Sequence, residues 1–258
     1  MAPRIGVYDS GTGGLTTLAL LRAKLPKCSF LYYADTARMP FGSKSREEIF
    51  ECAGEALRVL RRETDIAVFG CNTASVTVRP KDVFCLHPDL GSCDPHHTLV
   101  LATPATVAAT DARGKGFLTA DTSELAVLVE VRLALRFKSR TRLDCSDLED
   151  YLQRRLAPFA GRADRVLIGC SHYVYAEREI ARITGVSDCR DGNDALTERV
   201  ARAVYGSECA EPIFLRENTP DASDVSFIFT GGNEGAKYRW ILSRLAAEYV
   251  PKILIKRL

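Results

Sequence analysis

Two segments of the sequence share one pattern, an apolar run that ends in Gly-Cys and continues into small polar residues. The first is Ile66–Ser75 (IAVFGCNTAS) and the second is Val166–Tyr173 (VLIGCSHY). Short apolar runs stopped by glycine predict buried strands. Both cysteines then follow the carboxyl ends of strands, which is where open α/β sheets bind their ligands. The pattern therefore predicts two thiols, Cys71 and Cys170, presented from two strand ends.

The remaining elements alternate between strands and helices. Arg4–Tyr8 and Ser29–Ala34 are predicted strands on either side of a helix over Leu15–Leu25, and this βαβ order requires a parallel sheet. Leu99–Ala102 and Val225–Phe229 are predicted as later strands. Helices are expected after the capping box Ser45–Glu48 and over Ser123–Phe137, Leu148–Phe159, Ala176–Thr184, Ala195–Tyr205 and from Asn233 to Tyr249.

Two irregular segments are candidate crossings between two units of the fold. The first, residues 76–98, contains three prolines, and the second spans Asp188–Asp194. Residues 110–121 are expected to form a loop. We predict that residues 1–94 together with 190–258 form a first lobe, and that residues 95–189 form a second.

Composition excludes several classes of protein. The chain has 258 residues, of which 46% are hydrophobic and 26% charged, as in ordinary globular domains. A net charge of +2 gives no electrostatic reason to expect nucleic acid or a membrane surface as partner. The start of the chain lacks the apolar region of a signal peptide, which predicts a cytoplasmic protein. Nine scattered cysteines, an odd number, argue against a disulfide framework.

Parts of the sequence also fit two alternative kinds of site. Gly11-Thr-Gly-Gly14 follows a strand, and Asp35 follows the next one, as in a dinucleotide site; however, Thr16 occupies the position of the third glycine. A zinc cluster is the second alternative, although its spacing matches no known finger. The prediction is therefore neither a cofactor nor a metal. The residues of the zinc alternative are Cys85, His87, Cys93, His96 and His97.

The simplest interpretation of each candidate residue is structural. A free cysteine is usually a small buried hydrophobe, Asp9 can cap a helix, and His172 can be a satisfied core histidine. Against this, both thiols follow glycine at a strand end and precede residues that suit a helix start. Helix-start N–H groups lower the pKa of a nearby thiol, so we expect both cysteines to be activated.

Several motifs together resemble the signatures of glutamate racemases, in the order in which that family has them. The resemblance covers nearly the whole chain and is most specific in its first ninety or so residues. Phe41 and Ser171 stand where the family usually has Tyr and Thr. The motifs are GVYDSGTGGL (6–15), DTARMPFGSKS (35–45), CNTAS (71–75), ATPATV (102–107), GCSHY (169–173) and FTG (229–231).

This resemblance implies an α/β fold of two similar lobes, each a mainly parallel sheet flanked by helices, with the active site between them. It further implies a cofactor-independent racemase that interconverts L- and D-glutamate and supplies D-glutamate for peptidoglycan. Cys71 and Cys170 would be the catalytic acid/bases, assisted by Asp9 and His172. The sequence does not place the glutamate that some members use near the second thiol; Glu149 is a weak match and is not adopted. The residues implied to hold the substrate are Asp9, Ser10, Phe41, Gly42, Asn72, Thr73, Ser171 and His172.

Two other functions remain open from the sequence. One is a related racemase or isomerase acting on aspartate or another small dicarboxylate. The other is a catalytically silent binding homologue that keeps the two lobes. The oligomeric state is also open, a homodimer included.

Overall fold

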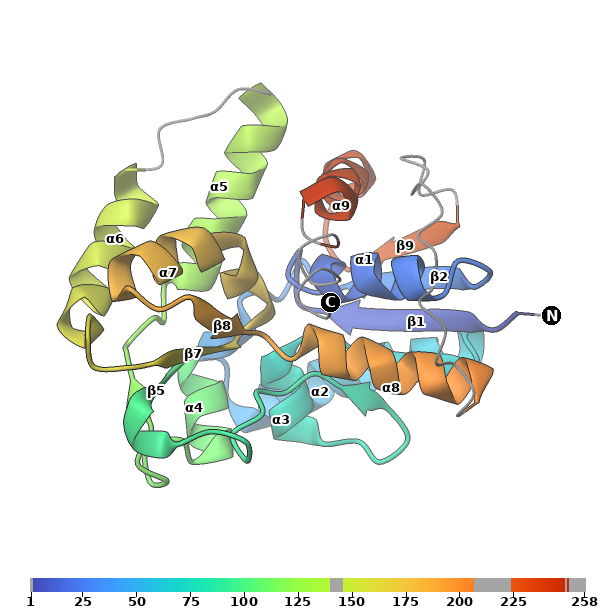
Figure 1. The fold of residues 1–258 in the computed structure, drawn as a ribbon. Helices are drawn as coiled ribbons and strands as arrows, with labels where there is room; N and C mark the ends of the chain where they lie inside the picture. The colour runs from blue at the N-terminus through green and yellow to red at the C-terminus, as the bar shows by residue number, and fades with distance from the viewer. Residues whose placement is uncertain (1, 140–145, 207–223, 249, 251–258) are drawn as a thin grey trace.

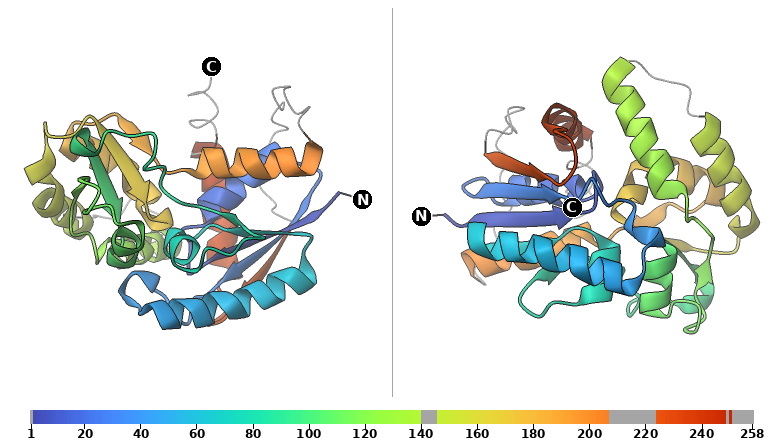
Figure 2. Two further views of the ribbon diagram at one scale, coloured as in Figure 1. Left: turned by 90° about the horizontal axis from the view of Figure 1, so that it is seen from below. Right: turned by 180° about the vertical axis from the view of Figure 1, so that it is seen from behind.

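The computed structural model of the chain describes residues 2–139, 146–206, 224–248 and 250. It is an α/β fold with two parallel sheets, which lie side by side in Figures 1 and 2. The first sheet has the strand order β4-β3-β1-β2-β9 and the second has β6-β5-β7-β8, with every neighbouring pair parallel. The predicted fold class is confirmed. The strands are β1 (Arg4–Asp9), β2 (Ser29–Ala34), β3 (Ile66–Phe69), β4 (Phe84–Cys85), β5 (Thr98–Ala102), β6 (Leu118–Thr119), β7 (Arg165–Gly169), β8 (Asp188–Arg190) and β9 (Val225–Phe229).

The predicted helices are present, with ends shifted by no more than about one turn. Ser45 and Glu48 form the expected reciprocal capping box at the start of α2. Asn233 Oδ1 accepts a hydrogen bond from the amide of Gly235, at the start of α9. The predicted end of that helix at Tyr249 lies outside the described residues. The helices are α1 (Leu15–Lys24), α2 (Arg46–Glu63), α3 (Asn72–Val78), α4 (Pro104–Thr110), α5 (Leu125–Ser139), α6 (Ser146–Leu156), α7 (Glu177–Thr184), α8 (Asn193–Tyr205) and α9 (Gly235–Glu248), with short 3-10 turns η1 (Phe41–Ser43), η2 (Pro95–His97), η3 (Ala157–Phe159) and η4 (Ser171–Ala176).

Three strands lie in segments that the sequence predicts to be irregular or crossing. These are β4, β6 and β8, which have two or three residues each and stand at sheet edges. A strand this short shows no alternation of apolar and polar residues, so no periodic signal marks it. The helix α4 was also not predicted, because it follows Thr103-Pro104 directly and has only seven residues.

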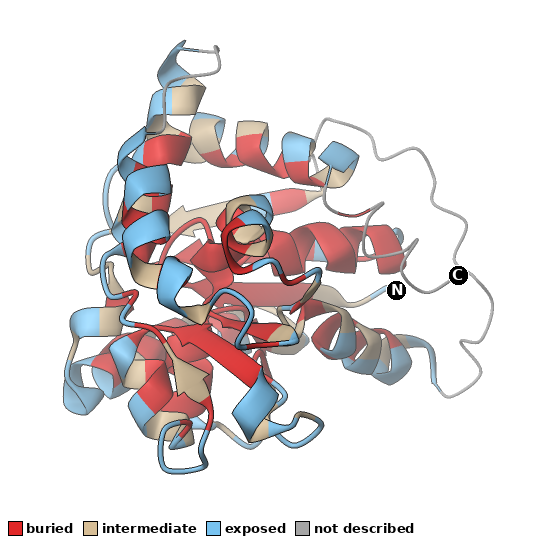
Figure 3. Ribbon diagram, turned by 60° about the vertical axis from the view of Figure 1, so that its left-hand side comes forward, coloured by how far each residue is buried: buried red, intermediate tan, exposed pale blue. Residues whose placement is uncertain are grey.

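Alternation along the strands explains how the first sheet is covered on both faces. Ile5 and Val7 of β1 pack into the cluster that includes α1, α8 and α9, whereas Tyr8 packs into the cluster that includes α2. Successive side chains of a strand point to opposite faces, so two apolar faces require two covering layers. Figure 3 shows the resulting band of buried residues along the strands and α1.

The chain crosses between the sheets twice, and the crossings touch. The first runs from the end of β4 to the start of β5, and the second is the short link between β8 and α8. Gly192 in the second has φ +78°, and a Cβ there would lie 2.8 Å from the carbonyl oxygen of His87 in the first. Arg199 donates to the carbonyl of Cys85 at 2.9 Å. The domain limits given above remain a prediction. No described helix is long and apolar enough to cross a membrane.

Candidate active site

Asp9, the last residue of β1, is fully buried where the two sheets meet. Its Oδ1 accepts from the amide of Gly11 at 2.7 Å, and its Oδ2 accepts from the hydroxyl of Ser171 at 2.9 Å. Burial raises the pKa of Asp9, and His172, the Gly11 amide and Ser171 oppose that rise. Asp9 and Ser171 are therefore brought together from different sheets, as two of the predicted site residues.

The glycine-rich turn after β1 allows the close approach of the second lobe. A Cβ on Gly13 would lie 2.3 Å from Ser171 Oγ and 2.8 Å from His172 Nδ1. A Cβ on Gly11 would lie 2.5 Å from Glu130 Oε1. These separations are shorter than van der Waals contact, so only glycine fits without displacing those groups. The turn that resembles part of a dinucleotide fingerprint here receives side chains of α5 and η4.

Cys71 follows β3 and is the N-cap residue of α3. It is buried, and its Sγ lies 3.9 Å from the hydroxyl of Ser10. The expectation that helix-start donors activate this thiol is wrong for the structure. Burial raises the pKa of Cys71, and the nearby Asp9 carboxylate raises it further; the amide of Ala74 opposes this but is outweighed. Both causes favour the neutral thiol form of Cys71.

Cys170 follows β7, and beside it lies a buried ion pair. His172 Nε2 is 3.0 Å from Glu130 Oε1. Burial alone lowers the pKa of His172, but hydrogen bonds to Cys170 and Glu130 outweigh it and raise that pKa well above the ordinary range. Burial raises the pKa of Glu130, but His172 and Thr12 outweigh it and lower that pKa to about 2. Both shifts describe an imidazolium–carboxylate pair with Cys170 as a neighbour.

Glu130 is the site residue that sequence reasoning missed. It lies on α5, and both the amide and the hydroxyl of Thr12 donate to its Oε1, at 2.7 and 2.8 Å. A signal was present, because Ala126, Val129 and Leu133 are buried and Glu130 shares their face at helical spacing. A carboxylate on the buried face of a helix is almost always paired with a cation or a hydrogen-bond donor. Glu149, which is not assigned this role, is exposed and pairs with Arg182.

The remaining predicted residues surround Cys71. Asn72 is buried, and within the described residues neither atom of its side-chain amide has a hydrogen-bond partner. Thr73 Oγ1 lies 2.9 Å from Thr103 Oγ1, a contact between α3 and the start of α4. Phe41 contacts the ring of Tyr8, with ring centroids 6.3 Å apart, and a Cβ on Gly42 would lie 2.8 Å from Thr103 Cβ. Phe41 and Gly42 therefore pack against Tyr8 and Thr103, which are neighbours of the Cys71 segment.

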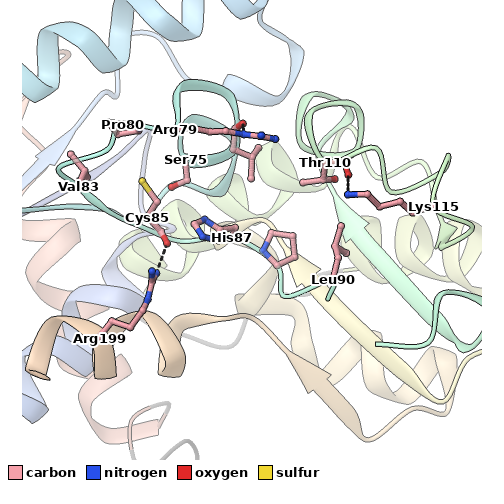
Figure 4. Close-up of a pocket in the computed structure, with 12 residues that line it drawn as sticks. Ser75, Arg79, Pro80, Val83, Cys85, His87, Leu90, Thr110, Lys115 and Arg199 are labelled. Carbon is pink, nitrogen blue, oxygen red and sulfur yellow. Dashed lines mark hydrogen bonds between the residues drawn. The ribbon is translucent and has the colours of Figure 1, made fainter. Parts of the chain in front are cut away.

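The residues of the zinc alternative are not gathered. No group of three or more His, Cys, Asp or Glu side chains in the described part of the chain could hold a metal ion. Cys85 and His87 instead line a pocket of about 440 Å³ beside the lobe crossings (Figure 4). Arg79, Lys115 and Arg199 line the same pocket. The positive charges of these side chains repel a metal cation and disfavour its binding in this pocket.

The groups gathered here are ones that take up and release protons. They are two buried thiols, one of them with an imidazolium as neighbour, and two buried carboxylates. The charge of Cys170 is one of the smaller causes that raise the pKa of Cys71. General acid–base chemistry of this kind needs a base and an acid placed around one reacting carbon.

Comparisons with known proteins point in the same direction. The chain is 32% identical to the glutamate racemase of Deinococcus radiodurans, with 91% of each chain covered. It is 34% identical to that of Herpetosiphon aurantiacus, over 81% of this chain and 87% of the relative. The crystal structure of the Thermus thermophilus glutamate racemase with β-chloro-D-alanine matches with a TM-score of 0.70 and 25% identity, covering 94% of this chain and 92% of that one. No protein-family model matches.

The fold and the relatives define a two-lobed α/β protein of the cofactor-independent racemase class. With these relatives, the chain belongs to the aspartate/glutamate racemase family.

The close approach at Gly13 generates a prediction about stability. Gly13→Ala places a methyl group against Ser171 and His172, so we expect it to lower the free energy of unfolding by about 1–3 kcal/mol, the usual cost of overpacking. Gly54 is the matched control: it lies within α2, and a Cβ there meets no atom within 4 Å. Gly54→Ala is expected to stabilise by roughly 0.5–1 kcal/mol. Urea unfolding of both variants measures the difference; equal effects would show that the turn is not tightly packed.

The Glu130–His172 pair generates a prediction about pH. Glu130→Gln leaves an imidazolium without its carboxylate, and we expect a loss of about 3 kcal/mol of unfolding free energy. The pKa of Glu130 is lowered from 4.5 to about 2, so its contribution is present above 4.5 and is lost as the pH falls toward 2. The pKa of His172 is raised above 6.5, so its contribution is full below 6.5 and is lost as the pH rises through the raised value. Unfolding measured across pH should therefore separate Glu130→Gln from wild type most between 4.5 and 6.5, and a gap independent of pH would contradict the ion pair.

Proposed function

We propose that this protein is a cofactor-independent glutamate racemase whose two acid/bases are Cys71 and Cys170. The observation that carries the proposal is the pair of buried thiols at the ends of β3 and β7, one from each sheet, with Asp9 and His172 beside them. The two sequence relatives reported above are both named glutamate racemase, which supports glutamate as the substrate.

Racemisation needs two proton-transfer groups because the proton leaves one face of Cα and returns to the other. One cysteine, as thiolate, takes the α-proton, and the electron pair stays on the substrate as a carbanion. The opposite cysteine, as thiol, donates its proton to that carbanion. The thiol and thiolate have then exchanged roles, and the product is the other enantiomer. Burial raises the pKa of Cys71, which suits its thiol to donate first, and the buried His172 imidazolium lies beside Cys170.

The α-proton of an amino acid is very weakly acidic, so the site must also stabilise the carbanion. Asn72 supports this role, since its buried amide can donate to and accept from a ligand. Ser10 and Ser171 add hydroxyls on the two sides, next to Cys71 and Asp9 respectively. A closed site between the lobes strengthens such contacts by excluding water. D-glutamate made in this way would supply peptidoglycan synthesis.

The test of the proposed function is exchange at Cα in deuterium oxide. Purified protein is incubated with L- or D-glutamate, and in parallel with L- or D-aspartate, without added cofactor. We expect deuterium in both enantiomers of glutamate. Incorporation into aspartate alone would point to a related dicarboxylate racemase, and no incorporation into either would point to a binding homologue. Activity should survive dialysis against a chelator in reducing buffer.

The two-thiol scheme predicts opposite defects for the two Cys→Ser variants. Serine keeps the shape of cysteine but is a far poorer base, so each variant should lose racemisation by at least about 1,000-fold. The intact thiolate can still remove the proton of 3-chloroglutamate; chloride then leaves from the β carbon, and water converts the enamine to 2-oxoglutarate and ammonia. By the family resemblance, Cys71→Ser should act on the L enantiomer and Cys170→Ser on the D enantiomer. Formation of 2-oxoglutarate measures this, and a shared preference for one enantiomer would contradict the scheme.

A further inference from the structure

Glu130 uses its two carboxylate oxygens for different contacts. Oε1 accepts from the amide and hydroxyl of Thr12 and lies 3.0 Å from His172 Nε2. Oε2 has one cation within ion-pair distance in the described part of the chain, Lys237 Nζ at 3.8 Å. The carboxylate therefore stands between two cations, His172 on the side of Cys170 and Lys237 on the other.

Lys237 belongs to α9, and its side chain is only 13% exposed. A lysine that is buried to this extent needs partners, and it has two carboxylates: Glu234 at 2.5 Å, just before α9, and Glu130 on α5. Its Nζ also lies 5.4 Å from the ring centroid of Tyr238. The contact therefore joins the two lobes, since α9 packs on the first sheet and α5 on the second.

A second contact crosses between the same two helices. The rings of Phe137 on α5 and Trp240 on α9 meet edge to face, with centroids 5.9 Å apart. In Figure 1 the two helices stand next to each other on the same side of the molecule. The Phe137–Trp240 contact therefore holds α9 against α5, the two helices that carry Lys237 and Glu130.

We infer that Lys237 is a positioning residue for the Cys170 half of the reaction, acting through Glu130 on His172. The inference rests on the proposed racemase function. Lys237 shares the negative charge of Glu130, which leaves the His172 imidazolium available to Cys170. Without Lys237 the whole charge of Glu130 falls on His172, and the thiolate at Cys170 loses part of its positive surroundings.

The other titratable groups that face this contact are acidic or neutral. Arg132, two residues along α5, is engaged elsewhere, with Glu179 and the carbonyl of Tyr175. Lys237 and His172 therefore supply the positive charge next to Glu130. The groups that face the contact are Asp9 of β1, Tyr32 of β2, Cys170 after β7, Tyr175 of η4, Glu234 before α9 and Tyr238 of α9.

The test places Lys237→Met in each single-cysteine background and measures 2-oxoglutarate from the 3-chloroglutamate enantiomer that each accepts. In Cys71→Ser, where Cys170 is the base, we expect elimination to slow on the order of tenfold, within the range for residues coupled in one network. The pH midpoint of that reaction should also shift, because Lys237→Met removes one positive charge next to the Glu130–His172 pair. In Cys170→Ser, where Cys71 is the base, the rate should change less than about twofold. Lys237→Arg should restore both readouts.

Lys24→Met is the matched control, since Lys24 is a buried lysine on α1 that also pairs with two carboxylates, Asp194 and Glu198. It should leave both elimination rates in place. If Lys237→Met melts before assay temperature, Lys237→Gln replaces it. Equal slowing in both backgrounds would make Lys237 a structural residue and overturn the inference, as would no slowing in either. If neither single-cysteine variant eliminates and the wild type does not racemise, the racemase proposal falls and this inference falls with it.

Discussion

The structure depends on the close approach of the turn after β1 to the start of η4. Two parallel sheets that each end in a thiol do not make a common site unless their backbones come almost into contact. Gly11 and Gly13 permit this, because any side chain there would occupy the space of Glu130, Ser171 or His172. The hydrogen bonds from Ser171 to Asp9 and from Thr12 to Glu130 then connect the lobes. Because Gly11 and Gly13 have no side chains, the lobes can come into contact and the thiols are buried between them.

Enclosure makes the two thiols chemically unequal. Cys71 is near Asp9, and burial and that carboxylate together keep it protonated. Cys170 is near a histidine that is charged because Glu130 holds it. Two residues of one type, each following glycine at a strand end, therefore differ through their neighbours rather than through their own local structure. A reaction that needs an acid on one side and a base on the other can use this difference.

The sequence was informative wherever local rules decide the outcome. Apolar runs stopped by glycine located β3 and β7, and parallel topology then required Cys71 and Cys170 to lie at the sheet ends where ligands bind. The sequence did not identify Glu130 because its place in the site depends on contacts with Thr12 and His172, which are distant in sequence. The predicted direction of the pKa shift of Cys71 is wrong for a similar reason. The amide of Ala74 at the helix start does lower this pKa, but burial and Asp9 raise it by more. The edge strands β4 and β8 are too short to carry a pattern.

The side-chain amide of Asn72 links the stability of the folded protein to ligand binding. This buried amide has no hydrogen-bond partner among the described residues, which disfavours the folded state by about 1–3 kcal/mol for each group left unsatisfied. A ligand that satisfies the amide relieves that penalty, so binding strengthens the fold as well as filling the site. The resistance of the protein to heat or proteolysis in a cell would then follow the concentration of its substrate. The folded protein would therefore be most stable when its substrate is bound.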